Sequence, residues 1–189
     1  MNEKQMKELA RSEGLDNAEF LGTNQLQFDP TLRRYCEENA CGNYGNNYAC
    51  PPSCGTPEQL EAVVRRHDRA LVLQTIQKLD DLTDPGQIRE ARGRHNEMTW
   101  RLTGRLEAEG VTGLRIMAGP CTACAVCAIR EGAPCRFPEK KASCLSTYCI
   151  CAEKMAQSCG MPYWCGDNTV AFFSMFLPDN GKLKEKEEK

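Results

Sequence analysis

Thirteen cysteines stand out in this chain of 189 residues, and four of them follow one another in the run GPCTACAVCAIREGAPCRFP. Cys121, Cys124 and Cys127 are separated by two residues each, and Cys135 follows shortly before Pro138. Two-residue spacers return successive thiols to the same side of a metal centre. The same C-x2-C-x2-C core, with a later cysteine near a proline, holds iron–sulfur clusters, whereas structural zinc sites usually present two separated cysteine pairs. The run therefore predicts an iron–sulfur cluster, with zinc as the alternative.

A second cysteine segment, CEENACGNYGNNYACPPSCG, lies earlier in the chain and ends at Gly55. It carries Cys36, Cys41, Cys50 and Cys54 among glycines and asparagines. Glycine and asparagine tolerate left-handed backbone conformations, which let a loop wrap around a cluster. The spacings match no single common metal motif, so the alternative is a surface loop with incidental cysteines. The density of thiols favours a second metal site.

Composition points to a reducing compartment. The odd number of cysteines argues against a closed disulfide framework, and dense cysteines in a cytosolic chain indicate metal binding. The N-terminus is polar without an apolar signal region, and no stretch is long enough to span a membrane. The net charge of −2, with both signs interspersed, predicts neither a nucleic-acid nor a membrane surface. We therefore expect a cytoplasmic protein.

Hydrophobic periodicity and capping signals predict an α/β fold. Helices are expected over about residues 3–12, 56–67, 84–110 and 151–159, and strands over about 18–28, 70–76, 113–118 and 169–177. This pattern predicts a small sheet of three to five strands flanked by helices, with the cysteine-rich loops at one end. One domain is expected over residues 1–180. The charged segment 181–189 has no apolar face and is expected to fray.

The motifs CGNYGNNYACPP, GPC-x2-C-x2-C and CRFPEKK resemble those of a prokaryotic family of predicted cysteine-rich metal-binding proteins, a domain of unknown function. The resemblance extends from about Cys36 to Leu177. It implies metal or iron–sulfur binding in anaerobe-type metabolism, without a settled reaction. The cysteines that carry over from the family are Cys36, Cys41, Cys50, Cys121, Cys124, Cys127 and Cys135. The ASCLS segment after Lys141 departs from the family pattern, so no family carboxylate is expected there.

Two thiol-rich segments suggest two 4Fe–4S clusters, each needing four ligands. The simplest assignment gives three ligands to each segment and leaves the fourth ligands open, because Cys135 fits either cluster and Cys54 competes for the first. The leading hypothesis is an electron-transfer or redox-accessory protein that works with a redox protein partner. The chain has no G-x-G-x-x-G run at a helix start for a dinucleotide, and no catalytic residues are assigned.

Two other functions stay open at this point. One is a reductase-type enzyme in which a cluster with three cysteine ligands leaves one iron open to substrate. The other is a zinc-stabilised interaction module. A third metal site is a further alternative for five cysteines outside the two motifs, although we favour two clusters. These five are Cys144, Cys149, Cys151, Cys159 and Cys165.

Overall fold

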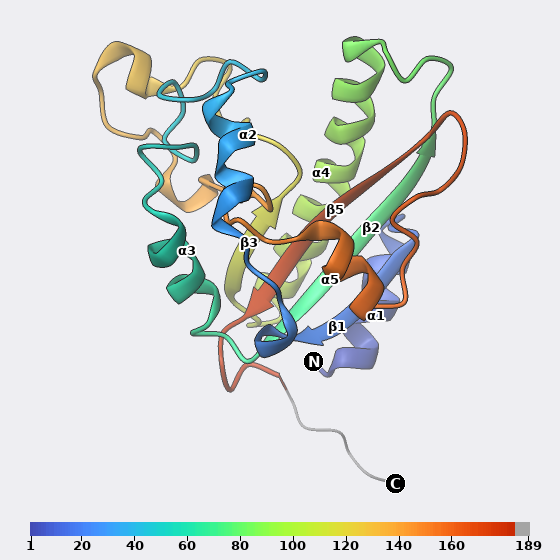
Figure 1. Ribbon diagram of the computed structural model, residues 1–189. Coiled ribbons are helices and arrows are strands. Elements are labelled where there is room, and N and C mark those ends of the chain that lie inside the picture. The colour runs from blue at the N-terminus through green and yellow to red at the C-terminus, as the bar shows by residue number, and fades with distance from the viewer. Residues whose placement is uncertain (184–189) are drawn as a thin grey trace, which may run out of the picture.

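A five-stranded mixed sheet organises the chain in the computed structural model, which describes residues 1–183 (Figure 1). The strands are β1 (Asn17–Gly22), β2 (Arg69–Lys78), β3 (Gly113–Met117), β4 (Ser143–Cys144) and β5 (Thr169–Pro178). They lie in the order β1-β2-β5-β3-β4. Neighbours pair antiparallel except β3 and β4, which are parallel.

Five α-helices flank this sheet, which confirms the predicted α/β class. They are α1 (Glu3–Ser12), α2 (Arg34–Glu37), α3 (Pro57–Val64), α4 (Pro85–Ala108) and α5 (Ala152–Ser158). The two cysteine-rich loops lie near each other beyond α2 and α3 (Figure 1). They are joined by a hydrogen bond of 2.9 Å from the Asn47 amide to the Cys121 carbonyl and by another of 2.9 Å from the Tyr48 hydroxyl to the Ala133 carbonyl.

The two faces of β2 pack into two separate cores. Ala70 and Val72 belong to a hydrophobic cluster that includes residues of α3 and α5, whereas Leu71 and Leu73 belong to a cluster formed with α1 and α4. Successive residues of a strand point to opposite faces. The sheet is therefore covered on both sides, which explains why β2 reads as a continuous apolar run.

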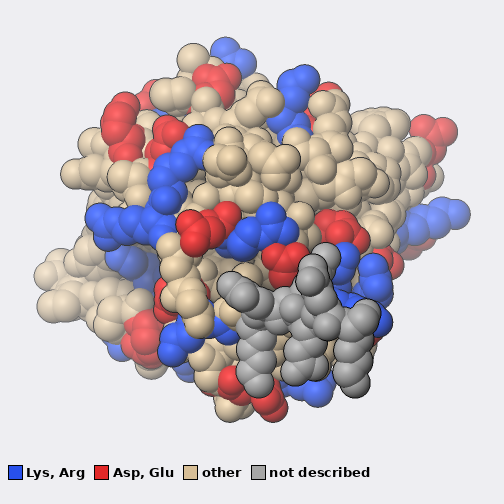
Figure 2. Space-filling model, turned by 90° about the horizontal axis from the view of Figure 1, so that it is seen from below, with Lys and Arg blue, Asp and Glu red and all other residues tan. Residues whose placement is uncertain are grey.

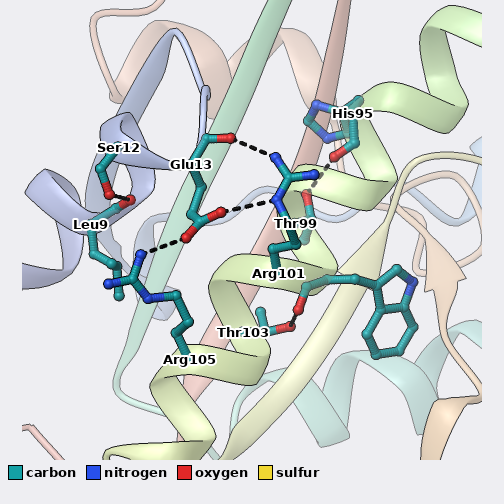
Figure 3. Close-up of polar contacts among 9 residues, drawn as sticks. Leu9, Ser12, Glu13, His95, Thr99, Arg101, Thr103 and Arg105 are labelled. Atoms are coloured by element: carbon teal, nitrogen blue, oxygen red, sulfur yellow. Dashed lines mark hydrogen bonds and ion pairs between the residues drawn. The ribbon is translucent and has the colours of Figure 1, made fainter.

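An ion-pair cluster fastens the end of α1 to α4 (Figure 3). The Glu13 carboxylate accepts hydrogen bonds from Arg101 Nε at 3.0 Å and from Arg105 Nη1 at 2.7 Å. The hydrogen bond from Arg105, followed by that from Arg101, lowers the pKa of Glu13. This contact ties the C-terminal half of α4 to α1. The N-terminal half of α4 carries Arg92, which lies near the cysteine loops.

Local signals place most element boundaries correctly. Thr56 and Gln59 form the predicted capping box at the start of α3, and Asp84 caps α4. The predicted strand over residues 18–28 is wrong beyond Gly22, because residues 23–25 form a 3-10 turn. The Gln25 side chain accepts a hydrogen bond of 3.0 Å from the Gly22 amide, which closes this turn.

The described surface carries both signs of charge (Figure 2). No helix among residues 1–183 is long and apolar enough to cross a membrane. On the face seen in Figure 2, basic and acidic side chains are interspersed, as the sequence pattern predicts. Of the predicted charged tail over residues 181–189, residues 184–189 lie outside the described part.

His95 on α4 is a buried titratable group in the core. Its side chain is fully buried, with Nδ1 2.9 Å from the Thr75 hydroxyl, and its Nε2 has no hydrogen-bond partner among the described residues. Burial lowers the pKa of His95 to about 4. The folded chain therefore holds this imidazole neutral at pH values where the unfolded chain protonates it.

Replacing His95 by glutamine should remove an acid-dependent loss of stability. The unfolded imidazole binds its proton below about pH 6.5, while the folded one waits until about pH 4. The lowered pKa of His95 leaves the free energy of unfolding unchanged above about pH 6.5. It reduces that free energy by about 3 kcal/mol below about pH 4, since each pKa unit is worth about 1.4 kcal/mol. Denaturant unfolding from pH 7 to pH 4 would measure the gap in the free energy of unfolding between the wild type and H95Q, which should shift in favour of H95Q as the pH falls. A gap that stays constant over this range would contradict the assignment.

Candidate metal centre

A cavity with four cysteines in its wall lies where distant segments of the chain meet. Its volume is about 200 Å³. The cysteines that line it are Cys36, Cys41, Cys50 and Cys144. Since a water molecule occupies about 30 Å³ in the liquid, this space exceeds the needs of a single ion and admits a group of several atoms.

Three of these cysteines come from the first cysteine segment, as the sequence predicts. Cys36 lies on the single turn of α2, and Cys41 and Cys50 lie on the loop that follows. Asn39 and Gly42 adopt φ angles of 54° and 71° in this loop. These left-handed conformations turn the backbone back on itself, which confirms the role predicted for the asparagines and glycines.

The fourth cysteine, Cys144, is delivered by the sheet. It lies on β4, whose parallel pairing with β3 sets Cys144 opposite Met117. The neighbouring Ser143 hydroxyl donates a hydrogen bond to the Ala49 carbonyl, so β4 is tied directly to the first cysteine loop. Sequence reasoning left Cys144 unassigned because a two-residue strand carries no periodic signal. The only local hint was the density of cysteines after residue 143.

Burial and neighbouring thiols oppose the ionisation of Cys50 and Cys36. Burial raises the pKa of Cys50 to about 12, and the charges of Cys144, Cys41 and Cys36 add to this effect. Burial also raises the pKa of Cys36, with Cys144 the second cause, whereas the Thr147 hydroxyl and Arg33 act in the opposite direction. Thiolates gathered in one cavity need a cationic centre beside them, because metal binding replaces the protons that burial and repulsion retain.

The four thiols line a shared space rather than converge on one point. Among residues 1–183, no set of three or more His, Cys, Asp or Glu side chains is arranged to hold a metal ion directly. The thiols instead stand around a space of about 200 Å³. Soft thiolates are the ligands that zinc, copper(I) and iron–sulfur clusters prefer, so this cavity offers a site for a metal of that class.

Cys54, predicted as a competing fourth ligand, is not among the residues that line this cavity. Its sulfur lies 3.5 Å from Arg33 Nη1 and packs against the core cluster that contains Leu60 and Val64. Burial raises the pKa of Cys54, and the hydrogen bond from Arg33 opposes this rise. The structure thus places Cys144 in the cavity wall and Cys54 beside a guanidinium.

The second predicted set, Cys121, Cys124, Cys127 and Cys135, lies on one loop. All four are partly exposed. A short 3-10 turn over Ala128–Glu131 separates the first three from the fourth and ends at Gly132, whose φ is 65°. Cys135 is not among the residues that line the four-cysteine cavity. It lies on the same loop as Cys121, Cys124 and Cys127.

The cysteines beyond residue 143 are dispersed over the described structure. Of these five, Cys144 alone lines the four-cysteine cavity. Cys149 is buried near the Pro30 carbonyl, and Cys151 and Cys159 flank the two ends of α5. Burial raises the pKa of Cys159 to about 11, with the charge of Glu19 a lesser cause. This dispersal does not favour a third site built from all five.

A larger cavity adjoins the second cysteine loop. Its volume is about 450 Å³, and Cys121 lies in its wall with Trp100, Met117 and Lys140. Pro120 lines both this cavity and the one with four cysteines. The two cavities therefore share a lining residue in the turn that leads from β3 into the second loop.

The fold and the site define a cysteine-rich α/β protein whose thiols gather at one end of a small sheet. A family model described as predicted metal-binding protein (DUF2284) matches residues 19–177, which include both cysteine segments. The chain belongs to this family, and the resemblance drawn from the motifs is confirmed. Neither the curated proteins nor the solved structures provide a match to the chain.

Replacing Cys144 by serine should lower the bound metal by about half, because it removes one wall of one of two sites and a hard oxygen is a poor substitute for a soft thiolate. Replacing Cys159 by serine provides a matched control, since this cysteine packs against the apolar core. Metal analysis of the two purified variants beside the wild type would make the comparison. Equal metal contents in the two variants would contradict the placement of Cys144.

Proposed function

We propose that this protein holds two 4Fe–4S clusters and carries electrons as a redox accessory protein. One cluster would be held by the thiols of Cys36, Cys41, Cys50 and Cys144, and the other by those of Cys121, Cys124, Cys127 and Cys135. Thiolate-bound iron clusters change oxidation state with little ligand movement, and surrounding dipoles and charges tune their potential. The clusters thus supply the redox chemistry, and the chain supplies ligands, burial and charge.

The four-cysteine cavity is the single observation that carries this proposal. It combines four soft donors, a volume of about 200 Å³ and two thiols, Cys36 and Cys50, whose pKa values are raised by burial and by neighbouring sulfur charges. Structural zinc needs four donors within reach of one ion. The four cysteines instead line a space of about 200 Å³, which favours a cluster over the zinc-stabilised module.

The second cysteine loop supports contact with a redox protein partner. Its thiols are partly exposed, and two apolar side chains beside them, Val126 and Phe137, are 51% and 38% exposed. Electron transfer between proteins uses small interfaces, where a few exposed apolar residues surround the site. We propose that the partner docks here, in the reducing cytoplasm of a cell with anaerobe-type metabolism.

A reductase-type enzyme is the second candidate function, favoured by the cavity of about 450 Å³ beside Cys121. Ligand pockets of this size combine apolar walls with a few polar groups, and here Trp100, Met117 and Lys140 line one cavity. The first cluster is a poor place for an open iron, because Cys144 supplies a fourth thiol. An open iron would therefore belong to the second loop.

After anaerobic purification or reconstitution, each chain should contain about eight iron and eight sulfide ions, the sum of two four-iron clusters. The protein should be brown, and dithionite should bleach it reversibly. Iron, zinc and acid-labile sulfide would be measured on the same sample. Stoichiometric zinc with negligible sulfide would reject the proposal in favour of the zinc-stabilised module.

Turnover would separate the carrier from the enzyme. A pure carrier exchanges electrons with a partner protein and leaves small molecules unchanged. Steady consumption of reduced viologen on addition of a small-molecule acceptor, lost on replacing Lys140 by alanine with both clusters retained, would favour the reductase.

A further inference from the structure

Arg33 is a buried cation beside the four-cysteine cavity. Its side chain is only 8% exposed, and it ends the 3-10 turn that leads directly into α2 and Cys36. Arg33 Nη2 donates a hydrogen bond of 2.9 Å to the Thr147 carbonyl, and Nη1 donates one of 3.3 Å to the Gly55 carbonyl. Thr147 itself lines the cavity, so the guanidinium lies immediately behind the cavity wall.

This cation lacks a carboxylate partner among the described residues. Several arginines pair with acidic groups, as Arg69 does with Glu3, whereas Arg33 forms no ion pair within residues 1–183, and neither does Arg92 in the cavity wall. Its Nε is buried without any hydrogen-bond partner. An unpaired buried charge is costly, so a guanidinium in this position needs negative charge nearby.

Sulfur is the available source of that charge. Cys149 and Cys54 both interact with the guanidinium, Cys54 at 3.5 Å from Nη1, and the cavity wall beyond Thr147 carries four more thiols. Four thiolates around a cluster give a group with net negative charge, whose charge grows when it is reduced. Guanidinium is the cation suited to partly desolvated ion pairs, because its charge is permanent and weakly hydrated.

We propose that Arg33 is the counter-charge of the four-cysteine site and raises the reduction potential of the group bound there. This inference rests on the proposed function, since it assigns the four thiols to a redox-active metal group. Arg33 favours the reduced, more negative state through its positive charge. It also holds the cavity wall in place through the Thr147 and Gly55 carbonyls, so Arg33 acts as a positioning and tuning residue rather than as a ligand.

Two substitutions separate the charge from the contacts. Arg33→Lys keeps the positive charge but loses the planar fork, whereas Arg33→Gln loses the charge but keeps an amide donor for the carbonyls. Redox titration of the loaded full chain should show one of two transitions moved to lower potential in R33Q. We expect at least a tenfold change in the ratio of oxidised to reduced sites, which is about 59 mV for one electron. R33K should stay near the wild type.

Arg65→Met provides a matched control away from the cavity. Arg65 also bonds backbone carbonyls, those of Thr23 and Leu26, and covers the Phe28 ring at 4.6 Å. This variant should lose stability without moving either potential. A loaded R33Q with both potentials unchanged would overturn the proposal. Failure of both R33Q and R33K to fold would overturn it too, because folding would then require the planar guanidinium and its hydrogen bonds rather than the positive charge. A folded R33K beside an unfolded R33Q would support it.

Cadmium binding tests Arg33 independently of iron. Cadmium thiolate complexes are also negatively charged, so the affinity of the full chain for cadmium alone should fall at least tenfold in R33Q and stay near wild type in R33K and Arg65→Met. Absence of iron and sulfide from the wild type would reject the proposed function while leaving this readout intact. Equal cadmium affinities in the wild type and R33Q would reject the role of Arg33.

Discussion

The site depends on one electrostatic constraint, namely that thiolates crowded into a partly buried cavity repel each other. Cys50 and Cys36 have raised pKa values because burial and neighbouring sulfur charges both penalise the ionised form. Positive charge inside the cavity, or close behind its wall, relieves this penalty. The remaining structure serves this requirement, since it brings donors from distant segments together and sets Arg33 behind them.

The fold meets the constraint through the edge of the sheet. The loop that holds Cys41 and Cys50 is shaped by local turns, but it reaches its position only through contacts with other segments. The hydrogen bonds from Ser143 to Ala49 and from Asn47 to Cys121 join it to β4 and to the second loop. The α/β core beneath, with both sheet faces covered, keeps these loops from separating.

Local information in the sequence was enough for most of the fold and for half of the site. Helix caps and apolar runs located α3, α4, β2 and β5 within a few residues, because these signals act between near neighbours. The motif spacing likewise grouped Cys36, Cys41 and Cys50. The parallel pairing that delivers Cys144 was beyond such reasoning, because it depends on a contact between residues far apart in the chain.

Cys54 shows what a tertiary contact adds to sequence spacing. By spacing it competes with Cys135 for the fourth position of the first cluster, and the structure sets its sulfur 3.5 Å from Arg33 Nη1. The signal that separates it from Cys144 is charge: a buried guanidinium needs a polarisable or negative neighbour, and Cys54 provides one. The Arg33 guanidinium therefore contacts Cys54 on one side and, through the Thr147 carbonyl, the wall of the four-cysteine cavity on the other. Under the proposed function this gives the two sites different tasks, because the partly exposed second loop suits contact with a partner, while the four-cysteine site is the one whose potential Arg33 can set.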